Sequence, residues 1–327
     1  MRHLKADIVY RATNNLREGE SQIAPLQTLR ALPSGVLVAT GVGTSLKSYD
    51  RGLTWQRFGD SSLAGEDISD IAEGNGCAIV LTRGQCRTRV WKGDLRENQW
   101  VHTSDLPDAT HGYVSVSSVG ILIAALQGGN RLQVFVSSDN GVNWKLNYES
   151  VTSGTLNQFV MNASGIGIGM FLNLTEIQDE SDFESTLLAV DCLAPRALDR
   201  RVVHANIQSG LSDGQHKWIL GASGGIVFGY DSATGTLETR MAFDNEQLNI
   251  TGVHFNQGKM CAIAEEPEPP GNIWVLYENS QRQWGSIRTG IRSYVYGSQL
   301  ARDYLLILTS TTIYRLLISD LFARRAS

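Results

Sequence analysis

Carboxylates in two loop segments are the first residues whose spacing could do chemistry. Residues 172–184 hold Glu176 and Asp182, and Glu265 stands in a later acidic, proline-rich stretch. A glycoside hydrolase needs two carboxyl groups about 5 to 9.5 Å apart across a cleft. Either of the first two residues could face Glu265 in that way, although no aromatic sugar platform accompanies the pair. Glycosidase chemistry is therefore an alternative that the sequence leaves open.

Metal ligands and nucleophiles are not grouped at the spacings that their chemistry requires. The histidines stand singly, and the four cysteines show no metal-type spacing. A calcium loop starting at Asp139 fails, because Trp144 stands where a glycine is needed and no bidentate glutamate follows. No G-x-S-x-G elbow or phosphate-binding glycine loop is present. We expect no metal, no cofactor and no catalytic residue, which favours a non-enzymatic protein without settling the matter.

One spaced pattern occurs twice and points to local structure. Both copies read S-x-D-x-G-x-x-W: Ser48, Asp50, Gly52 and Trp55, then Ser137, Asp139, Gly141 and Trp144. The carboxylate can accept backbone N–H groups of its own turn, and glycine supplies a position with positive φ. The indole can pack at the edge of a sheet. The pattern therefore predicts a β-hairpin held by its own side chains.

This pattern resembles the Asp-box (BNR repeat) hairpin of sialidase-like β-propellers. The resemblance implies an all-β propeller in which the motif residues are structural. A sialidase would further need three arginines, a tyrosine nucleophile with a glutamate, and an aspartate. Tyr294, Tyr296 and Glu278 offer part of that set, but no arginine triad can be assembled and the arginine-isoleucine-proline motif is absent. Propellers resembling this one also occur in nozzle and hub proteins of tailed-bacteriophage tails.

A recurring apolar run defines the repeat. The runs begin at Val36, Ala78, Ile121, Ile166, Trp218, Met260 and Leu305. The steps between them are 42, 43, 45, 52, 42 and 45 residues, which is the length of one four-stranded propeller blade. A second apolar run follows each of them. We predict a single domain, residues 1–327, that forms a seven-bladed β-propeller of four-stranded antiparallel blades, with six blades as the alternative.

The blade boundaries follow from the same repeat. We expect the fourth strands to begin near Trp55, Trp100, Trp144, Arg201, Leu237 and Trp284, and the first strand of the last blade to span residues 293–297. The last blade then lacks a fourth strand, so we expect residues 1–14 to supply it and close the ring. Residues 172–184 are expected to be an acidic loop insertion in blade four.

Composition and the distribution of apolar residues limit the partners and the locations that we expect for the protein. The chain has 327 residues, 33 glycines and a formal net charge of −5, which gives no reason to expect nucleic-acid binding. No apolar stretch is long enough for a membrane helix, and the first residues lack the apolar core of a signal peptide. We expect no membrane insertion, cytoplasmic synthesis without a signal peptide and, from the phage resemblance, incorporation into a virion.

Charged loops between the second and third strands form the predicted partner face. Its residues are Arg83, Arg87 and Arg131, then Glu176, Asp179, Glu180, Asp182, Glu265 and Glu266. These loops emerge on one face, opposite the two motif turns. A basic sector beside an acidic sector suits side-by-side packing of identical copies.

Two functions from different classes follow. The first is a non-enzymatic structural or protein-interaction subunit of a larger assembly, most concretely a bacteriophage tail (nozzle or hub) component, whose partners include copies of itself. The second is a carbohydrate-binding or sialidase-like glycoside hydrolase propeller.

Overall fold

The described part of the chain is an all-β structure. The computed structural model describes residues 4–11, 26–59, 62–63, 65–174, 183–243, 248–256, 258–267, 271–279, 283–318 and 321. Within these ranges, 28 strands form seven four-stranded sheets. No helix among the described residues has the length and apolarity needed to cross a membrane. The predicted seven-bladed β-propeller is confirmed, and the six-blade alternative is wrong.

Blades two to five form one compact unit, Ile68–Ile250. Blade two comprises β6 (Asp67–Gly74), β7 (Cys77–Arg83), β8 (Thr88–Asp94) and β9 (Gln99–Leu106). Blade three comprises β10 (His111–Val116), β11 (Leu122–Gly128), β12 (Arg131–Ser137) and β13 (Lys145–Val151). Blade four comprises β14 (Thr155–Met161), β15 (Ile166–Leu174), β16 (Phe183–Asp191) and β17 (Arg196–Val203). Blade five comprises β18 (Ile207–Ser212), β19 (Lys217–Ala222), β20 (Ile226–Asp231) and β21 (Thr236–Ala242).

Blades one, six and seven belong to the other compact unit, Met1–Asp67 with Thr251–Ser327. Blade one comprises β2 (Leu26–Ala31), β3 (Leu37–Gly41), β4 (Thr44–Ser48) and β5 (Gln56–Arg57). Blade six comprises β22 (Asn249–Asn256), β23 (Lys259–Glu265), β24 (Asn272–Glu278) and β25 (Trp284–Arg292). Blade seven comprises β26 (Gly297–Ala301), β27 (Tyr304–Leu308), β28 (Thr312–Leu317) and β1 (Ala6–Arg11).

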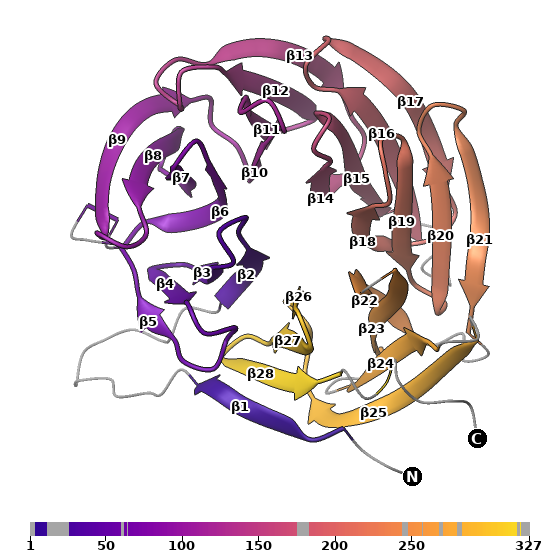
Figure 1. The fold of residues 1–327 in the computed structure, drawn as a ribbon. Helices are drawn as coiled ribbons and strands as arrows, with labels where there is room; N and C mark the ends of the chain where they lie inside the picture. The colour runs from indigo at the N-terminus through magenta and orange to yellow at the C-terminus, as the bar shows by residue number, and fades with distance from the viewer. Residues whose placement is uncertain are drawn as a thin grey trace. The chain divides into compact units, whose positions relative to one another are not determined.

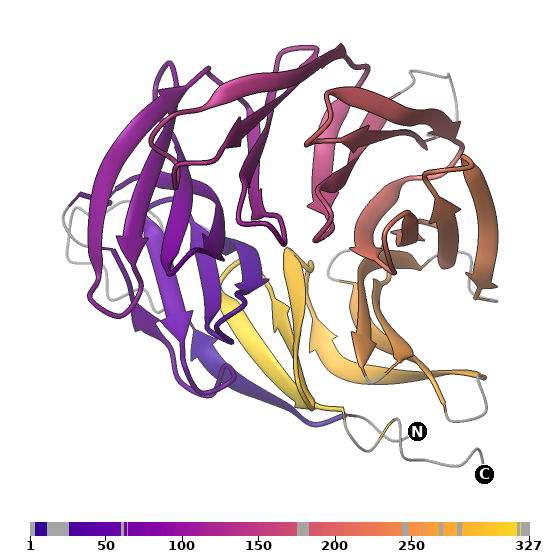
Figure 2. The ribbon, with the colours of Figure 1, turned by 45° about the horizontal axis from the view of Figure 1, so that its top comes forward.

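The N-terminal strand completes the last blade. β1 pairs antiparallel with β28, and the register runs from Ala6 opposite Leu316 to Arg11 opposite Thr312. β1 lies along β28 in both views of the ribbon (Figures 1 and 2). The N-terminal strand therefore supplies the fourth strand that the sequence of blade seven lacks. The described part of the closing segment is residues 4–11.

The second strand of each blade forms the core, because it is apolar on both faces. All residues of β3 are buried, and β27 is buried from Leu305 to Leu308. Between blades two and three, Leu81 and Leu106 pack with Leu126 and Phe135 in one buried cluster. Such runs of small and branched apolar side chains favour strands that are covered on both sides.

A β-bulge recurs in the outermost strand of blades two to five. In blade two the register passes from Val90 opposite Ser104 to Trp91 opposite His102, so Thr103 is the extra residue. The corresponding register shifts lie at Val134/Phe135, Ala189/Val190 and Val227/Phe228. A bulge turns the side chains that follow it and so decides which of them share a face.

Three predicted boundaries are wrong. β17 begins at Arg196 and not near Arg201, because its first residues are exposed and no tryptophan marks its start. β26 begins at Gly297, so residues 293–296 precede the first strand of blade seven. The expected insertion 172–184 is strand at both ends, where Leu172 pairs with Ser185 and Leu174 with Phe183. Residues 175–182 of that insertion lie outside the described residues.

Candidate functional site

The two motif turns have the same hydrogen bonds. In blade one, Ser48 Oγ donates to Asp50 Oδ1 (2.8 Å), Gly52 N donates to Ser48 Oγ (2.9 Å) and Trp55 Nε1 donates to Gly52 O (3.2 Å). The same three bonds in blade three measure 2.8, 3.0 and 3.1 Å between Ser137, Asp139, Gly141 and Trp144. Gly52 and Gly141 have φ of 78° and 82°, which favours glycine at both positions.

A polar residue four positions after each aspartate completes these turns. Thr54 donates to Asp50 through its backbone N and its side chain, at 2.8 and 2.6 Å. Asn143 donates to Asp139 in the same two ways, at 2.9 and 2.7 Å. The bonds from Asn143 lower the pKa of Asp139 to about 2. Sequence reasoning missed Thr54 and Asn143, although a polar residue just before the tryptophan marks both of them.

Basic residues of the predicted partner face are paired within their own blades. Arg87 Nη1 lies 2.6 Å from Asp105 Oδ2, and Arg131 Nη1 lies 2.8 Å from Glu149 Oε1. The hydrogen bond from Arg87 lowers the pKa of Asp105 despite a small opposing effect of desolvation. Arg83, at the end of β7, lowers the pKa of His111 together with the larger effect of burial.

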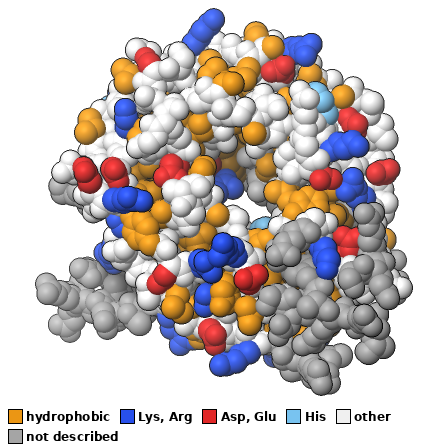
Figure 3. Space-filling model, viewed as in Figure 1, with side chains coloured by type: hydrophobic (Ala, Val, Ile, Leu, Met, Phe, Trp, Pro, Cys, Tyr) orange, Lys and Arg blue, Asp and Glu red, His pale blue; other side chains and the backbone are white. Residues whose placement is uncertain are grey.

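Acidic residues of the same predicted face are also engaged locally. Glu266 accepts hydrogen bonds from Trp274 Nε1 (3.0 Å) and Arg288 Nη2 (3.0 Å). Glu265 accepts one from Val295 N at 2.9 Å, and burial raises its pKa. Glu176, Asp179, Glu180 and Asp182 lie outside the described residues. Basic and acidic side chains are interspersed over the face drawn in Figure 3.

The structure gives the exposure or the hydrogen-bond partner of each residue that was considered for sialidase chemistry. Tyr294 and Tyr296 are half exposed and precede β26, so their predicted place in that strand is wrong. Glu278 accepts a hydrogen bond from Met260 N at 3.4 Å. Among the described residues, no group of three or more His, Cys, Asp and Glu side chains could hold a metal ion.

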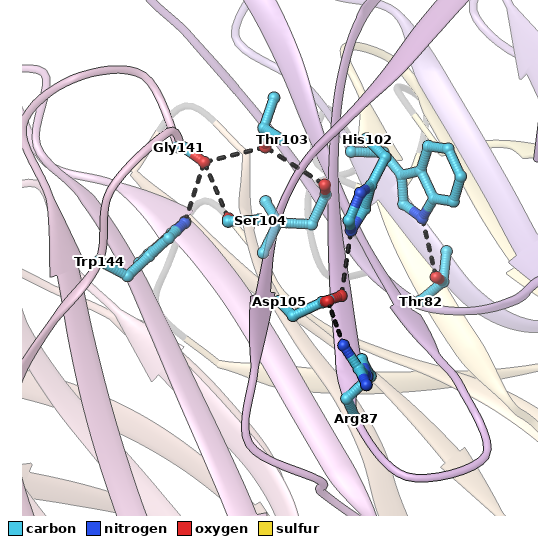
Figure 4. A network of polar contacts seen from close by, with 10 residues as sticks. Thr82, Arg87, His102, Thr103, Ser104, Asp105, Gly141 and Trp144 are labelled. Carbon is cyan, nitrogen blue, oxygen red and sulfur yellow. Dashed lines mark hydrogen bonds and ion pairs between the residues drawn. The ribbon is translucent and has the colours of Figure 1, made fainter.

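Blade two carries a cavity of about 430 Å³ on its outer strands. Its lining residues are Arg87, Arg89, Trp91, His102 and Asp105. Asp105 lies between two partners, since Oδ2 meets Arg87 and Oδ1 lies 3.0 Å from His102 Nε2 (Figure 4). The ring of Trp91 meets the ring of His102 edge to face, with centroids 5.3 Å apart. Trp91 Nε1 donates to Thr82 Oγ1 at 2.9 Å, which fixes the indole.

A second feature lies at the turns of blades two and three. Asn75 Nδ2 lies 2.9 Å from both Gly120 O and Asn140 Oδ1. Thr103 and Ser104 of β9 donate to Gly141 O at 2.9 and 3.0 Å, as Figure 4 shows. These bonds connect four segments: the turns at Asn75, Gly120 and Asn140–Gly141, and strand β9.

Three exposed valines are sequence neighbours of these bonded residues, and we call them the three-valine surface: Val101, Val119 and Val142. Their side chains are 65%, 71% and 49% exposed. Each stands within two residues of an atom in the bonded network, because Val101 precedes Thr103, Val119 precedes Gly120 and Val142 follows Gly141. None of these valines belongs to the predicted partner face.

Comparisons with solved structures show the fold. YCF48 bound to D1 peptide has a TM-score of 0.68 and 10% identity, and the match covers 97% of this chain and 96% of that chain. YCF48 from Cyanidioschyzon merolae has a TM-score of 0.66 and 12% identity, with 96% and 99% covered. The extracellular domain of BT4673 from B. thetaiotaomicron has a TM-score of 0.63 and 12% identity, with 96% of this chain but 40% of that chain covered. No protein-family model and no curated protein matches the sequence. At these identities the chain shares a propeller fold with these proteins.

Proposed function

We propose that this protein is a non-enzymatic propeller that binds protein partners, including copies of itself, within a larger assembly. The observation that carries the proposal is the three-valine surface. Exposed apolar side chains are common one by one, but a group of them on one surface marks a protein-interaction site. Here the hydrogen bonds of Asn75 hold two of the turns in place, so little conformational entropy is lost on docking.

Charge contributes less to the assembly than the sequence indicated. Arg87 and Arg131 already have carboxylate partners in their own blades. Removing such a residue from its partner on binding would offset much of the gain from a new ion pair. Apolar contact at the valines, with charges at the rim setting register, is the arrangement that the described residues support best.

A more specific version of this proposal is a component of a bacteriophage tail, such as a nozzle or hub subunit inside a virion. It rests on the resemblance of the two motif turns to Asp-box propellers, and it is supported by the backbone N–H bond that each motif aspartate accepts within its own turn. The likeness to YCF48, solved with a D1 peptide, supports the broader idea that a propeller of this kind holds a polypeptide partner.

Sedimentation velocity over a concentration series tests the proposal. We expect the unaltered chain to form larger species as its concentration rises, and Val119→Asp with Val142→Asp to stay monomeric. Val151→Asp is the matched control, because Val151 is an equally exposed valine, 59%, outside the three-valine surface. A monomeric unaltered chain, or equal loss of assembly in the control, contradicts the proposal. Glycan binding on an array without assembly would favour the carbohydrate-binding alternative.

A further inference from the structure

We propose that the cavity of blade two is a binding site for carboxylate side chains of an acidic peptide segment. The site lies apart from the three-valine surface, and its test does not depend on self-assembly. It is built from β8, β9 and the turn before β8, all in one compact unit. Five side chains of four kinds line it: two arginines, a tryptophan, a histidine and an aspartate.

The fixed ion pair gives the cavity a preorganised cation. Arg87 uses Nη1 for Asp105, and a guanidinium carries five N–H donors in a planar fork. The remaining donors can meet a carboxylate without breaking the pair with Asp105. Because Asp105 also meets His102, one carboxylate orients two of the groups that line the cavity.

The lining of the cavity favours a carboxylate that is carried on an apolar stem. Arg87 and Arg89 line it together with Asp105. A carboxylate can accept the unused N–H donors of Arg87, and it places less negative charge beside Asp105 than a phosphate dianion does. Trp91 lines the cavity, and its indole is held by the hydrogen bond to Thr82, so its ring supplies an apolar wall for the methylene groups of an acidic side chain.

Blade three shows that these residues are not required by the blade scaffold. Each of these blade-two residues has a counterpart in blade three that lies 44 positions later in the chain, as Arg131 does for Arg87. The counterparts pair in the same strand register. The equivalent pairs are Thr82 and Leu126, Arg87 and Arg131, Arg89 and Gln133, Trp91 and Phe135, His102 and Leu146, and Asp105 and Glu149. Blade three thus keeps the arginine–carboxylate pair but replaces the other cavity residues with neutral or apolar ones.

Isothermal titration calorimetry with N-acetyl-triglutamate amide tests this site. We expect the unaltered chain to bind this peptide and not N-acetyl-triglutamine amide, acetate or inorganic phosphate at the same millimolar concentrations. Arg87→Gln should weaken binding about tenfold or more, as expected for the loss of a charge-assisted contact. Arg131→Gln is the matched control, since both arginines are similarly exposed (58% and 62%) and paired to a carboxylate. It should leave the affinity within about twofold.

Several results would overturn the proposal. The proposal is wrong if triglutamate gives no heat of binding, or if triglutamine binds equally well. It is also wrong if phosphate binds more tightly than triglutamate, or if Arg87→Gln and Arg131→Gln lose the same affinity. Thermal melts of both variants establish that each is folded, and His102→Gln offers a second cavity variant. If triglutamate does not bind but the chain still assembles as its concentration rises, only the proposed carboxylate site is wrong. If triglutamate binds but the chain does not assemble, only the proposed assembly is wrong.

Discussion

Blades two and three have the same strand layout and the same arginine–carboxylate ion pair. They differ in the side chains that occupy equivalent positions on their outer strands. In blade three, Phe135 and Leu126 pack into the buried cluster that lies between these blades. In blade two, the equivalent Trp91 and Thr82 are joined by a hydrogen bond and stand beside Arg89, His102 and a cavity. The comparison shows that backbone register fixes where side chains meet, while residue type decides whether they pack or bind.

Both blades also use the bulge residue as a link to the next blade. Thr103 donates to Gly141 O in the motif turn of blade three, and Asn147 donates to Cys192 O in the corresponding turn of blade four. These links make the position of each turn depend on the preceding blade. Side-chain hydrogen bonds between blades, and not only the strand pairing within each blade, therefore position the residues around the cavity and the three-valine surface.

The largest expected effect is on packing in blade three. Phe135→Ala should destabilise the chain by about 3 to 5 kcal/mol, because it leaves a cavity in a buried cluster. Trp91→Phe in blade two keeps an apolar ring but loses the hydrogen bond to Thr82 Oγ1, and should cost about 1 to 2 kcal/mol. Denaturant unfolding measures both. A smaller loss for Phe135→Ala than for Trp91→Phe would mean that blade two, not blade three, depends on this position for packing.

The links between blades should have intermediate effects. Asn147→Ala removes two donors, to Cys192 O at 2.8 Å and to Leu193 O at 3.3 Å, and should cost about 1 to 3 kcal/mol. Thr103→Val should cost about 0.5 to 1 kcal/mol, because Ser104 still donates to Gly141 O. The same unfolding measurement ranks them. The reverse order would show that the second donor in blade two is not used.

The smallest effect concerns the acid sensitivity of the blade-three turn. Hydrogen bonds from Asn143 lower the pKa of Asp139 from 3.8 to about 2. A lowered pKa stabilises the folded chain above the unfolded value, and this stabilisation is lost as the pH falls from 3.8 toward 2. The difference in unfolding free energy between the unaltered chain and Asp139→Asn should therefore shrink over that range. A constant difference would show that the carboxylate charge does not support the turn.

The repeat made most of the fold predictable. The predicted apolar run at Ile166 and the predicted fourth-strand start at Trp284 coincide with the starts of β15 and β25, because an apolar run and a recurring tryptophan mark these two positions. The start of β17 was missed, since its exposed polar residues carry no alternation of burial. The N-terminal strand was predicted because blade seven lacked a fourth strand, a requirement that the repeat itself imposes.

The candidate sites were less predictable. Arg87 was selected for its charge, but Asp105 was not, because its place beside Arg87 depends on the register beyond the bulge at Thr103. The partners of Arg131, Glu265 and Glu266 likewise come from neighbouring strands or later connections. Counting charges in loops therefore missed that these side chains already have partners within the chain, so that only unused donors, such as those of Arg87, are left for a binding partner.

Exchange of the differing side chains tests the central contrast between blades two and three most directly. The variant Arg89→Gln, Trp91→Phe and His102→Leu gives blade two the residues of blade three and keeps Arg87 and Asp105. Calorimetry with N-acetyl-triglutamate amide should show affinity reduced about tenfold or more in this variant, with cooperative melting retained. Unchanged affinity in the folded variant, or no binding by the unaltered chain, would contradict the assignment of a binding site to blade two.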